Sequence, residues 1–450
     1  MGDFLPSMYI CQTKICLTSF YSDAKPKQYL RNDRKPVRHF FAKHPVTLAT
    51  RKHEESKLKM ARITDIRTTI WEWVGPVAPM PPHFCTTAGD LVSDVSGSIA
   101  GFRFLGWLIV EIECDDGTVG IGNAALAPHA CKATIDNYLK PLLIGADPMD
   151  TEYLWESMYR RTLPFGRKGI GMTAISAVDL ALWDAKGKIL NQPVFKLLGG
   201  RTKSKIPVYA SRLYSQPLET LYAEAKTYSD QGFKAVKLRF GWGPKDGLAG
   251  INKNIDLVKT VREAVGPDVD IMGDAYMGWN VEYTKRMLRL LEPLNMRWVE
   301  EPVISDDLAG YANLRAMNKV AISGGEHEYT LHGFRQALEL GAFDIAQFDV
   351  NRVGGITAAK KITSLCEAND VAVIPHAGQM HNYHITMSSY AGPMSEYFPK
   401  VPVEVGNELF WYIFDGEAEA QNGFIDLDDH AAGFGLTLKS PDPTEFKLTS

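Results

Sequence analysis

Three stretches of the sequence decide how the chain folds: Asp270-Ile-Met-Gly-Asp274, Arg297-Trp-Val-Glu300-Glu-Pro and Ala321-Ile-Ser-Gly-Gly-Glu326. Their carboxylates Asp274, Glu300 and Glu326 are separated by two equal steps of 26 residues. One strand, one helix and two short loops consume about that many residues in a strand–helix repeat. As successive parallel strands, the stretches would bring all three carboxylates to the same end of a sheet. Converging oxygen ligands suit a divalent cation such as Mg²⁺; the alternative is three unrelated acids at the starts of loops.

The strand–helix alternation extends to both sides of these stretches and predicts an α/β fold. Strand-like runs fall at 206–211, 235–240, 270–275, 297–302, 320–326, 345–349, 371–376 and 394–398. Helical patterns fall at 217–231, 251–265, 281–292, 307–317, 331–340, 356–368 and 381–390. Eight short strands in about 200 residues favour a closed barrel over an open, doubly wound sheet. We therefore predict a barrel catalytic domain over residues 196–404.

The chain ahead of the barrel has a different pattern, which indicates an α+β domain over residues 60–195. It begins with strand-like runs at 62–73 and 105–114, and helical patterns follow at 128–144, 150–161 and 173–186. The long loop at 79–101 contains His83 and has a length that is usually functional. We expect the last residues, 405–450, to return and pack on this first domain.

Charge and cysteine content set limits on the partners and the compartment. Residues 1–59 hold twelve Lys and Arg against five acids, although the whole chain has a formal charge of −4. We expect this basic stretch to be a disordered extension or an upstream start of a cytoplasmic protein; a mitochondrial presequence is the alternative. The six cysteines lack a metal-type spacing, which predicts free thiols in a reducing compartment. Neither the net charge nor any apolar run indicates a nucleic-acid or membrane partner.

Two more strand ends carry polar residues. The sixth barrel strand ends in Gln347-Phe-Asp349, the seventh in Ile374-Pro-His376, and Glu396 lies in the eighth. Neighbouring strand ends would bring Asp349 against His376, and a carboxylate at one ring nitrogen makes imidazole a better base. The structural alternatives are a helix cap for Asp349, a packed histidine for His376 and a surface charge for Glu396.

In this order, Asp274, Glu300, Glu326, Asp349, His376 and Glu396 resemble the site pattern of the enolase superfamily, mandelate racemase subgroup. The helix at 174–184 and the following stretch Gln192-Pro-Val-Phe-Lys-Leu-Leu-Gly-Gly200 also resemble the family's junction between its two domains. The resemblance implies a modified TIM barrel, (β/α)₇β, under an N-terminal α+β capping domain. It further implies Mg²⁺ held by the first three acids, an Asp349–His376 dyad, and a symmetric homo-oligomer.

One departure from the family narrows the predicted reaction. Many relatives carry Lys-x-Lys on the second barrel strand, but this chain has Lys237-Leu-Arg239, and a guanidinium does not serve as a base. A two-base racemase is therefore disfavoured. The stretches 240–247, 325–328 and 376–384 resemble the L-rhamnonate dehydratases, which act on acid sugars.

We predict five substrate-binding residues, His83, Arg239, His327, Lys237 and Arg103, of which His83 is the one that the resemblance implies. The family has an arginine where this chain has Gly97, and Arg103 is the nearest one. His381 and His384 have the spacing of a metal pair, although we expect them to be packing residues.

The implied reaction is a dehydration of the sugar acid. His376 would remove the C2 proton and return a proton to the departing C3 hydroxyl, with Mg²⁺ stabilising the enediolate and Glu396 donating to it if protonated. Two alternatives stay open at this point. One is another dehydratase or an epimerase on the same scaffold, and the other is a sugar-acid-binding protein without catalysis.

Overall fold

The computed structural model describes residues 61–80, 83–92 and 103–450, which belong to one compact unit. The prediction for residues 1–59 lies outside this part of the chain. None of the helices in the described residues is long and apolar enough to cross a membrane. The cysteines among them, Cys85, Cys114, Cys131 and Cys366, are all free and buried.

The predicted barrel is present as eight parallel strands alternating with seven helices. The strands are β4 (Ile206–Ser211), β5 (Ala235–Arg239), β6 (Asp270–Asp274), β7 (Met296–Glu300), β8 (Ala321–Gly324), β9 (Ile345–Ala346), β10 (Ala372–Val373) and β11 (Ser395–Tyr397). The helices are α6 (Leu218–Asp230), α7 (Gly247–Val265), α8 (Val281–Leu291), α9 (Leu308–Arg315), α10 (Thr330–Glu339), α11 (Gly355–Glu367) and α12 (Met380–Ser388). This is the (β/α)₇β order that the family resemblance implies.

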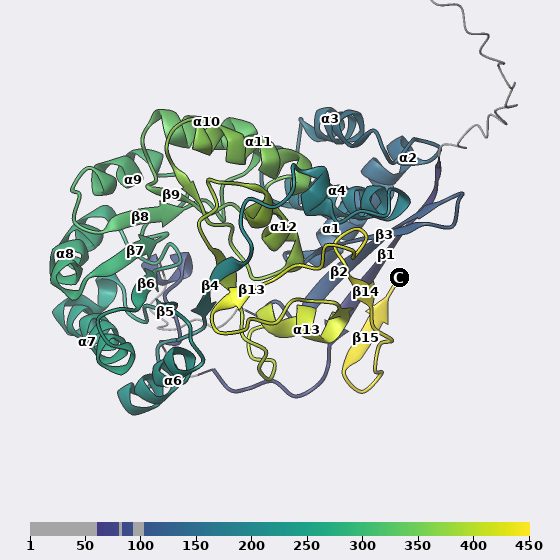
Figure 1. Ribbon diagram of the computed structural model, residues 1–450. Helices are drawn as coiled ribbons and strands as arrows, with labels where there is room; N and C mark the ends of the chain where they lie inside the picture. The colour runs from purple at the N-terminus through teal and green to yellow at the C-terminus, as the bar shows by residue number, and fades with distance from the viewer. Residues whose placement is uncertain (1–60, 81–82, 93–102) are drawn as a thin grey trace, which may run out of the picture. The chain divides into compact units, whose positions relative to one another are not determined.

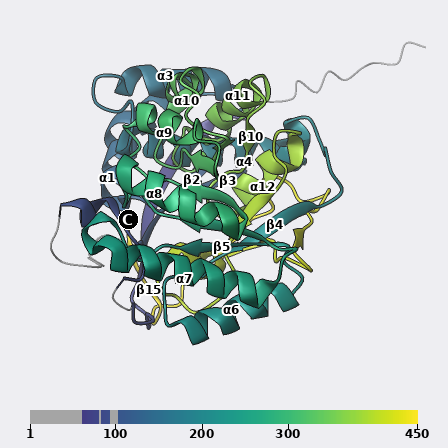
Figure 2. The ribbon, with the colours of Figure 1, turned by 90° about the vertical axis from the view of Figure 1, so that its left-hand side faces the viewer.

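The strands pair in the order β10-β9-β8-β7-β6-β5-β4-β11, so β10 and β11 lie at the two ends of the sheet. The Val373 amide in β10 donates to the Ala391 carbonyl just ahead of β11 (2.9 Å), which joins these ends. Helices α7–α10 lie outside the strands in Figure 1, and Figure 2 shows α6–α8 from the side. Because all eight strands are parallel, their carboxyl ends meet at one mouth.

The first domain is built on an antiparallel sheet. Its strands are β1 (Ile63–Trp73), β2 (Gly106–Cys114) and β3 (Val119–Ala124). The strand β15 (Phe446–Thr449) near the C-terminus pairs with β1 in the same sheet, as Figure 1 shows, so the end of the chain does return to the first domain. The domain limits at 60–195, 196–404 and 405–450 stay predictions.

The remaining elements are the helices of the first domain and a set of short helices and strands. Those helices are α1 (Pro128–Thr134), the π-helical turn η2 (Ile135–Leu139), α2 (Lys140–Leu143), α3 (Thr151–Thr162) and α4 (Ile170–Ile189). The short elements are η1 (Ala88–Leu91), α5 (Val194–Leu197), η3 (Pro244–Asp246), η4 (Glu292–Leu294), η5 (Asn407–Leu409), α13 (Phe410–Ile413), β12 (Phe414–Asp415), β13 (Phe424–Ile425) and β14 (Thr437–Leu438).

The helix predicted over 128–144 is divided into three pieces. Pro141 lies in the first turn of α2 and has no amide hydrogen, so it cannot form the regular bond to the preceding turn. A π-helical turn, η2, stands at this point, as is common where the regular hydrogen-bond pattern is interrupted. The hydrophobic periodicity continued through this interruption, which is why the sequence predicted one helix.

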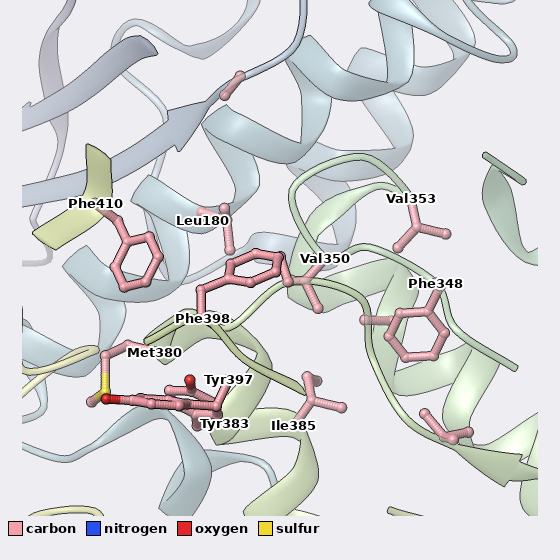
Figure 3. Close-up of a cluster of buried hydrophobic side chains, with 14 of the residues drawn as sticks. Leu180, Phe348, Val350, Val353, Met380, Tyr383, Ile385, Tyr397, Phe398 and Phe410 are labelled. Atoms are coloured by element: carbon pink, nitrogen blue, oxygen red, sulfur yellow. The ribbon is translucent and has the colours of Figure 1, made fainter. Parts of the chain in front are cut away.

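Helix α4 joins the two domains and is buried over most of its length. On one side it lies so close to β3 that a Cβ at Gly120 or Gly122 would stand about 2 Å from the carbonyl oxygens of α4. On the other side it packs against α11 of the barrel. Figure 3 shows Leu180 of α4 in the same cluster as Phe348, Val350 and Phe398 from the barrel. The sheet domain and the barrel therefore share one hydrophobic core.

Candidate functional site

The three evenly spaced carboxylates meet at the barrel mouth. Asp274 and Glu300 are the last residues of β6 and β7, and Glu326 lies two residues beyond β8. One oxygen from each carboxylate lies within 4.8 Å of the others, and all three side chains are buried. Like charges this close repel one another in a low-dielectric environment, so the group requires compensating positive charge.

Three buried cations surround these carboxylates. The Lys237 Nζ lies 2.7 Å from Glu300 Oε1, and Arg239 forms an ion pair with Asp274. The Arg352 guanidinium donates from Nη1 to Glu326 Oε2 (3.0 Å). Burial disfavours a charged lysine, but the neighbouring glutamates outweigh it and hold the pKa of Lys237 above its usual range.

The predicted dyad is formed at the next two strand ends. His376 Nδ1 lies 2.8 Å from Asp349 Oδ2, and its other ring nitrogen, Nε2, lies 2.9 Å from Glu326 Oε2. Arg352 also holds Asp349, through an Nε–Oδ2 contact of 2.9 Å. Burial disfavours the imidazolium, but Glu326 and the hydrogen bonds of the ring outweigh it and raise the pKa of His376. One histidine thus connects the dyad to the carboxylate group.

Glu396 contacts the same Lys237 ammonium that pairs with Glu300. Its Oε1 is 2.8 Å from the Lys237 Nζ, and its Oε2 accepts from the Ala377 amide (2.8 Å). Burial alone would favour a neutral carboxyl, but Lys237 and His376 outweigh it and lower the pKa of Glu396. In this arrangement the Glu396 oxygens accept, so the donation that the sequence analysis made conditional on a protonated Glu396 stays a prediction.

Left-handed backbone geometry is concentrated next to these groups. Tyr276 and Met277 have φ of 42° and 61° after β6, Glu301 has 38° directly after Glu300, and Ala377 has 73° directly after His376. Residues other than glycine pay a conformational cost for such angles, and strained residues are common at functional sites. The strain here lies within three residues of three predicted site residues.

The predicted substrate-binding residues differ in how close they lie to the three carboxylates. Lys237 and Arg239 lie among the carboxylates, as described above. His327 Nδ1 lies 2.7 Å from Glu301 Oε2, and these two residues form a second closely spaced ligand group with Glu326. His83 stacks on Trp242 (5.2 Å between ring centroids), and its Nδ1 lies 3.2 Å from the Gly241 carbonyl oxygen.

Arg103 donates to the Ala78 carbonyl oxygen (2.9 Å), and its role in substrate binding stays a prediction.

Besides Glu301, sequence reasoning missed two residues at the mouth. Arg352 links Asp349 to Glu326, and Gln347 donates from Nε2 to Glu300 Oε2 (3.0 Å). Both lie in the Gln347–Arg352 stretch at the end of the sixth barrel strand, so their position was a usable signal. His381 and His384 are packing residues as expected: both rings lie against Phe434, and burial lowers the pKa of each to about 3.

The charge balance of the site fits a divalent cation. Apart from Glu301, which pairs with His327 (2.7 Å), five buried carboxylates face the three buried cations, and this leaves two formal negative charges when the five are counted as ionised and His376 as neutral. The carboxylates are Asp274, Glu300, Glu326, Asp349 and Glu396. Mg²⁺ would balance this excess and prefers carboxylate oxygen. A cation at Glu326 would also weaken the attraction that raises the His376 pKa, which favours the neutral imidazole that a base requires.

Comparison with known proteins places the chain in a family. Residues 100–199 match the "Mandelate racemase / muconate lactonizing enzyme, N-terminal domain", and residues 220–442 match "Enolase C-terminal domain-like". An L-rhamnonate dehydratase of Saccharopolyspora erythraea is 37% identical over 304 residues, which are 67% of this chain and 75% of that protein. The chain belongs to the enolase superfamily. The predicted fold and subgroup are thereby confirmed.

Solved structures of the enolase superfamily superpose on most of the chain. The rhamnonate dehydratase of Gibberella zeae complexed with Mg is 34% identical, with a TM-score of 0.74 over 85% of this chain and 95% of that one. The 3,6-anhydro-D-galactonate cycloisomerase of Zobellia galactanivorans is 29% identical, with a TM-score of 0.69 over 84% and 97%. These two relatives have different reactions in their names, so enolase-superfamily membership fixes the fold and leaves the reaction to the site.

Proposed function

We propose that this protein is a magnesium-dependent acid-sugar dehydratase that converts L-rhamnonate to 2-dehydro-3-deoxy-L-rhamnonate and water. The observation that carries the proposal is the position of His376, between Asp349 and the carboxylate group. A proton-transfer residue next to a metal site is what dehydration beside a carboxylate requires. The relatives named L-rhamnonate dehydratase supply the substrate.

Asp274, Glu300 and Glu326 would hold the Mg²⁺. When bound, the ion would polarise the substrate carboxylate and so make the neighbouring C2 proton more acidic. The buried cations hold the three acids in position. Lys237 pairs with Glu300, Arg239 with Asp274, and Arg352 with Glu326.

His376 is the proposed acid and base. Asp349 accepts from Nδ1–H, and Nε2, which lies 2.9 Å from Glu326 Oε2, is the ring nitrogen that takes the C2 proton once it is deprotonated. The C2–H electrons then form the C2–C3 double bond, and the C3–O bond breaks. His376 returns its proton to the departing hydroxyl, which leaves as water, and the enol product becomes the 2-keto acid. Atoms and charge balance without a further reactant.

Lys237 is proposed to stabilise the negative charge that develops on the substrate, and Glu396 is proposed to hold the Lys237 ammonium in place. The ammonium of Lys237 is held charged by two glutamates, so it donates hydrogen bonds and does not abstract protons. With Arg239 next to it, this side of the site offers no neutral base opposite His376 among the described residues. That arrangement favours elimination over racemisation.

Several finer assignments complete the proposal. His83, His327 and Arg103 bind the hydroxyl groups of the sugar acid, with Arg239 also available to the substrate. Residues 60–195 with 405–450 form the capping domain, and residues 196–404 form the catalytic barrel. The protein works as a homo-oligomer in the cytoplasm.

The full-length protein with Mg²⁺ should form 2-keto acid from L-rhamnonate in a panel that also contains L-mannonate and L-lyxonate. Both EDTA and His376→Asn should abolish the product. Absence of keto acid from all three sugars, despite Mg²⁺ binding, would overturn the dehydratase proposal. Deuterium exchange at C2 without water loss would indicate an epimerase, and binding of a sugar acid without either reaction would indicate a non-catalytic protein.

A further inference from the structure

The turn that carries His376 has a strained backbone that is held at every polar group. His376 and Ala377 lie between β10 and α12, and Ala377 has a left-handed φ of 73°. Such an angle costs energy in any residue other than glycine, so it persists only where the surroundings hold it. The His376 amide donates to the Phe348 carbonyl oxygen (3.0 Å), and the Ala377 amide donates to Glu396 Oε2 (2.8 Å).

The two carbonyl groups of this turn share one partner, Asn382. Its Nδ2 donates to the His376 carbonyl oxygen (2.7 Å) and to the Ala377 carbonyl oxygen (2.8 Å). Because a carbonyl oxygen only accepts, the atom that contacts both must be the amide nitrogen, whose two hydrogens serve one carbonyl each. The Asn382 side chain is completely buried, so water does not compete for these bonds.

This pair of hydrogen bonds restrains the torsion at Ala377. The φ angle of Ala377 is the rotation between the planar peptide group that contains the His376 carbonyl and the carbonyl carbon of Ala377 itself. A change of φ therefore moves one carbonyl oxygen relative to the other, and both reach the same nitrogen only over a limited range of φ. Asn382 thus supplies the restraint that the left-handed conformation requires.

Helix α12 gives Asn382 a fixed position, because the helix is anchored away from the barrel mouth. The Phe195 amide in α5 donates to His384 Nδ1 (2.9 Å), near the middle of α12. At the end of the helix, Lys203 Nζ donates to the Thr386 carbonyl oxygen (2.6 Å). The position of Asn382 is therefore set by α5 and the segment after it, and the hydrogen bonds of its amide pass this position on to the turn.

We propose that Asn382 is a positioning residue that holds His376 for proton transfer by fixing the left-handed turn at Ala377. The imidazole belongs to the residue directly before that angle, so a change of the backbone there moves the ring relative to Asp349. A displacement of about 1 Å at a reacting group can cost about 100-fold in rate. The inference rests on the proposed function for the role of His376 and adds to it the group that sets its position.

The first test separates turnover from substrate binding. Asn382→Leu keeps the approximate size of the side chain and removes both hydrogen bonds; Asn382→Ala removes the same bonds and replaces it in every test if the leucine variant does not fold. With the full-length protein, Mg²⁺ and L-rhamnonate, kcat should fall about 10- to 100-fold and KM should change less than about threefold. KM should be nearly constant because the proposed metal and substrate ligands lie elsewhere. A loss that comes entirely from KM would overturn the inference.

A second substitution distinguishes positioning from general destabilisation. Ala377→Gly removes the cost of the left-handed angle, because glycine adopts positive φ without strain. The fold-loss of kcat caused by Asn382→Leu should therefore be at least about threefold smaller in the Ala377→Gly background than in the wild-type background. An equal loss in both backgrounds would contradict the proposed role.

The matched control is Asn254→Leu. Asn254 on α7 is also completely buried, and its Nδ2 donates to the Trp242 carbonyl oxygen (2.8 Å), at a different strand end. Its substitution should change kcat by the same factor in both backgrounds, because it does not act through Ala377. A loss in this control that Ala377→Gly also relieves would show that the relief is not specific to Asn382 and would overturn the inference.

Amide hydrogen exchange keeps the test decisive if the wild-type protein dehydrates no acid sugar. The proposed function would then have failed, but the exchange rate of the Ala377 amide still reports whether the turn is held. Asn382→Leu should raise this rate at least about tenfold, whereas Asn254→Leu should leave it unchanged. An unchanged rate in Asn382→Leu would show that the turn does not depend on Asn382 and would overturn the inference.

Discussion

Two groups of buried acids in this protein serve different ends. Asp179 and Asp184 lie on α4, between the domains, and Asp274, Glu300 and Glu326 lie at the barrel mouth. All five side chains are almost fully buried. Burial of a carboxylate is therefore not in itself a sign of function, and the partners of each acid must decide.

The α4 acids are satisfied one at a time by donors. Asp179 accepts from the Thr357 amide (2.9 Å) and from its hydroxyl (2.6 Å), at the first turn of α11. Asp184 accepts from the amides of Ile121 and Phe434 (both 2.9 Å) and pairs with Lys188 (2.6 Å). Each acid thus ties one element of the barrel or the C-terminal segment to the helix that joins the domains.

The acids at the mouth approach one another as well as their partners. Even with three cations nearby, the site retains an excess of negative charge, which a folded protein does not need for its own stability. The contrast gives a general rule: donors around a single carboxylate indicate a structural role, and converging carboxylates with excess charge indicate a cation site. Four predictions test the rule, from the largest effect to the smallest.

Glu326→Gln should lower turnover by at least about 10³-fold, because several kcal/mol of charge stabilisation depend on the bound ion. The unfolding free energy of the metal-free protein should change by only about 1 kcal/mol, because His376 can lose its proton and Arg352 retains its ion pair with Asp349. Turnover and chemical denaturation, measured on the same preparation, check both statements. A large loss of stability would place Glu326 with the structural acids.

Asp184→Ala should have the opposite effect, a large loss of stability with little loss of turnover per folded molecule. It removes the acceptor of two buried amides and should cost about 3 kcal/mol of unfolding free energy. The matched control is Asp230→Ala, which breaks an exposed pair with Lys226 and should cost less than about 0.5 kcal/mol. Urea denaturation of the three proteins without Mg²⁺ gives the comparison, and equal stabilities would contradict the role given to Asp184.

Mg²⁺ should stabilise the folded protein by about 2.7 kcal/mol at a concentration one hundred times its dissociation constant, because it binds the folded state selectively. EDTA should remove this increment. Glu300→Gln should weaken it, whereas Asp184→Ala should retain it. Thermal unfolding with and without Mg²⁺ measures the increment, and its survival in Glu300→Gln would remove Glu300 from the metal site.

Thr357→Val should have the smallest effect, a loss of about 1–2 kcal/mol. The side chain keeps its shape, but Asp179 loses one donor and the Trp183 indole loses its acceptor (2.8 Å). Activity per folded molecule should be unchanged, because these residues are not part of the barrel mouth. Loss of turnover without loss of stability would show that α4 acts on the chemistry directly.

The barrel was predictable because each strand–helix repeat can be recognised from residues that are neighbours in the sequence. Each strand is a short apolar run that ends in a polar residue, and the bounds of α6, α8 and α11 differ from the predicted ranges by at most one residue at each end. The dyad followed from the same logic, since neighbouring parallel strands place their ends together. The π-helical turn at Ile135–Leu139 was not predictable from periodicity, because Pro141 changes the backbone without changing the hydrophobic pattern.

The sequence by itself determined which residue types stand at the carboxyl ends of the strands, and so the fold, the carboxylate trio and the histidine. The tertiary structure decided how those groups are charged and paired. Arg352 joins Asp349 to Glu326, and Lys237 lies between Glu300 and Glu396. Periodicity is a property of neighbouring residues, whereas ion pairing depends on distances between residues far apart in the chain.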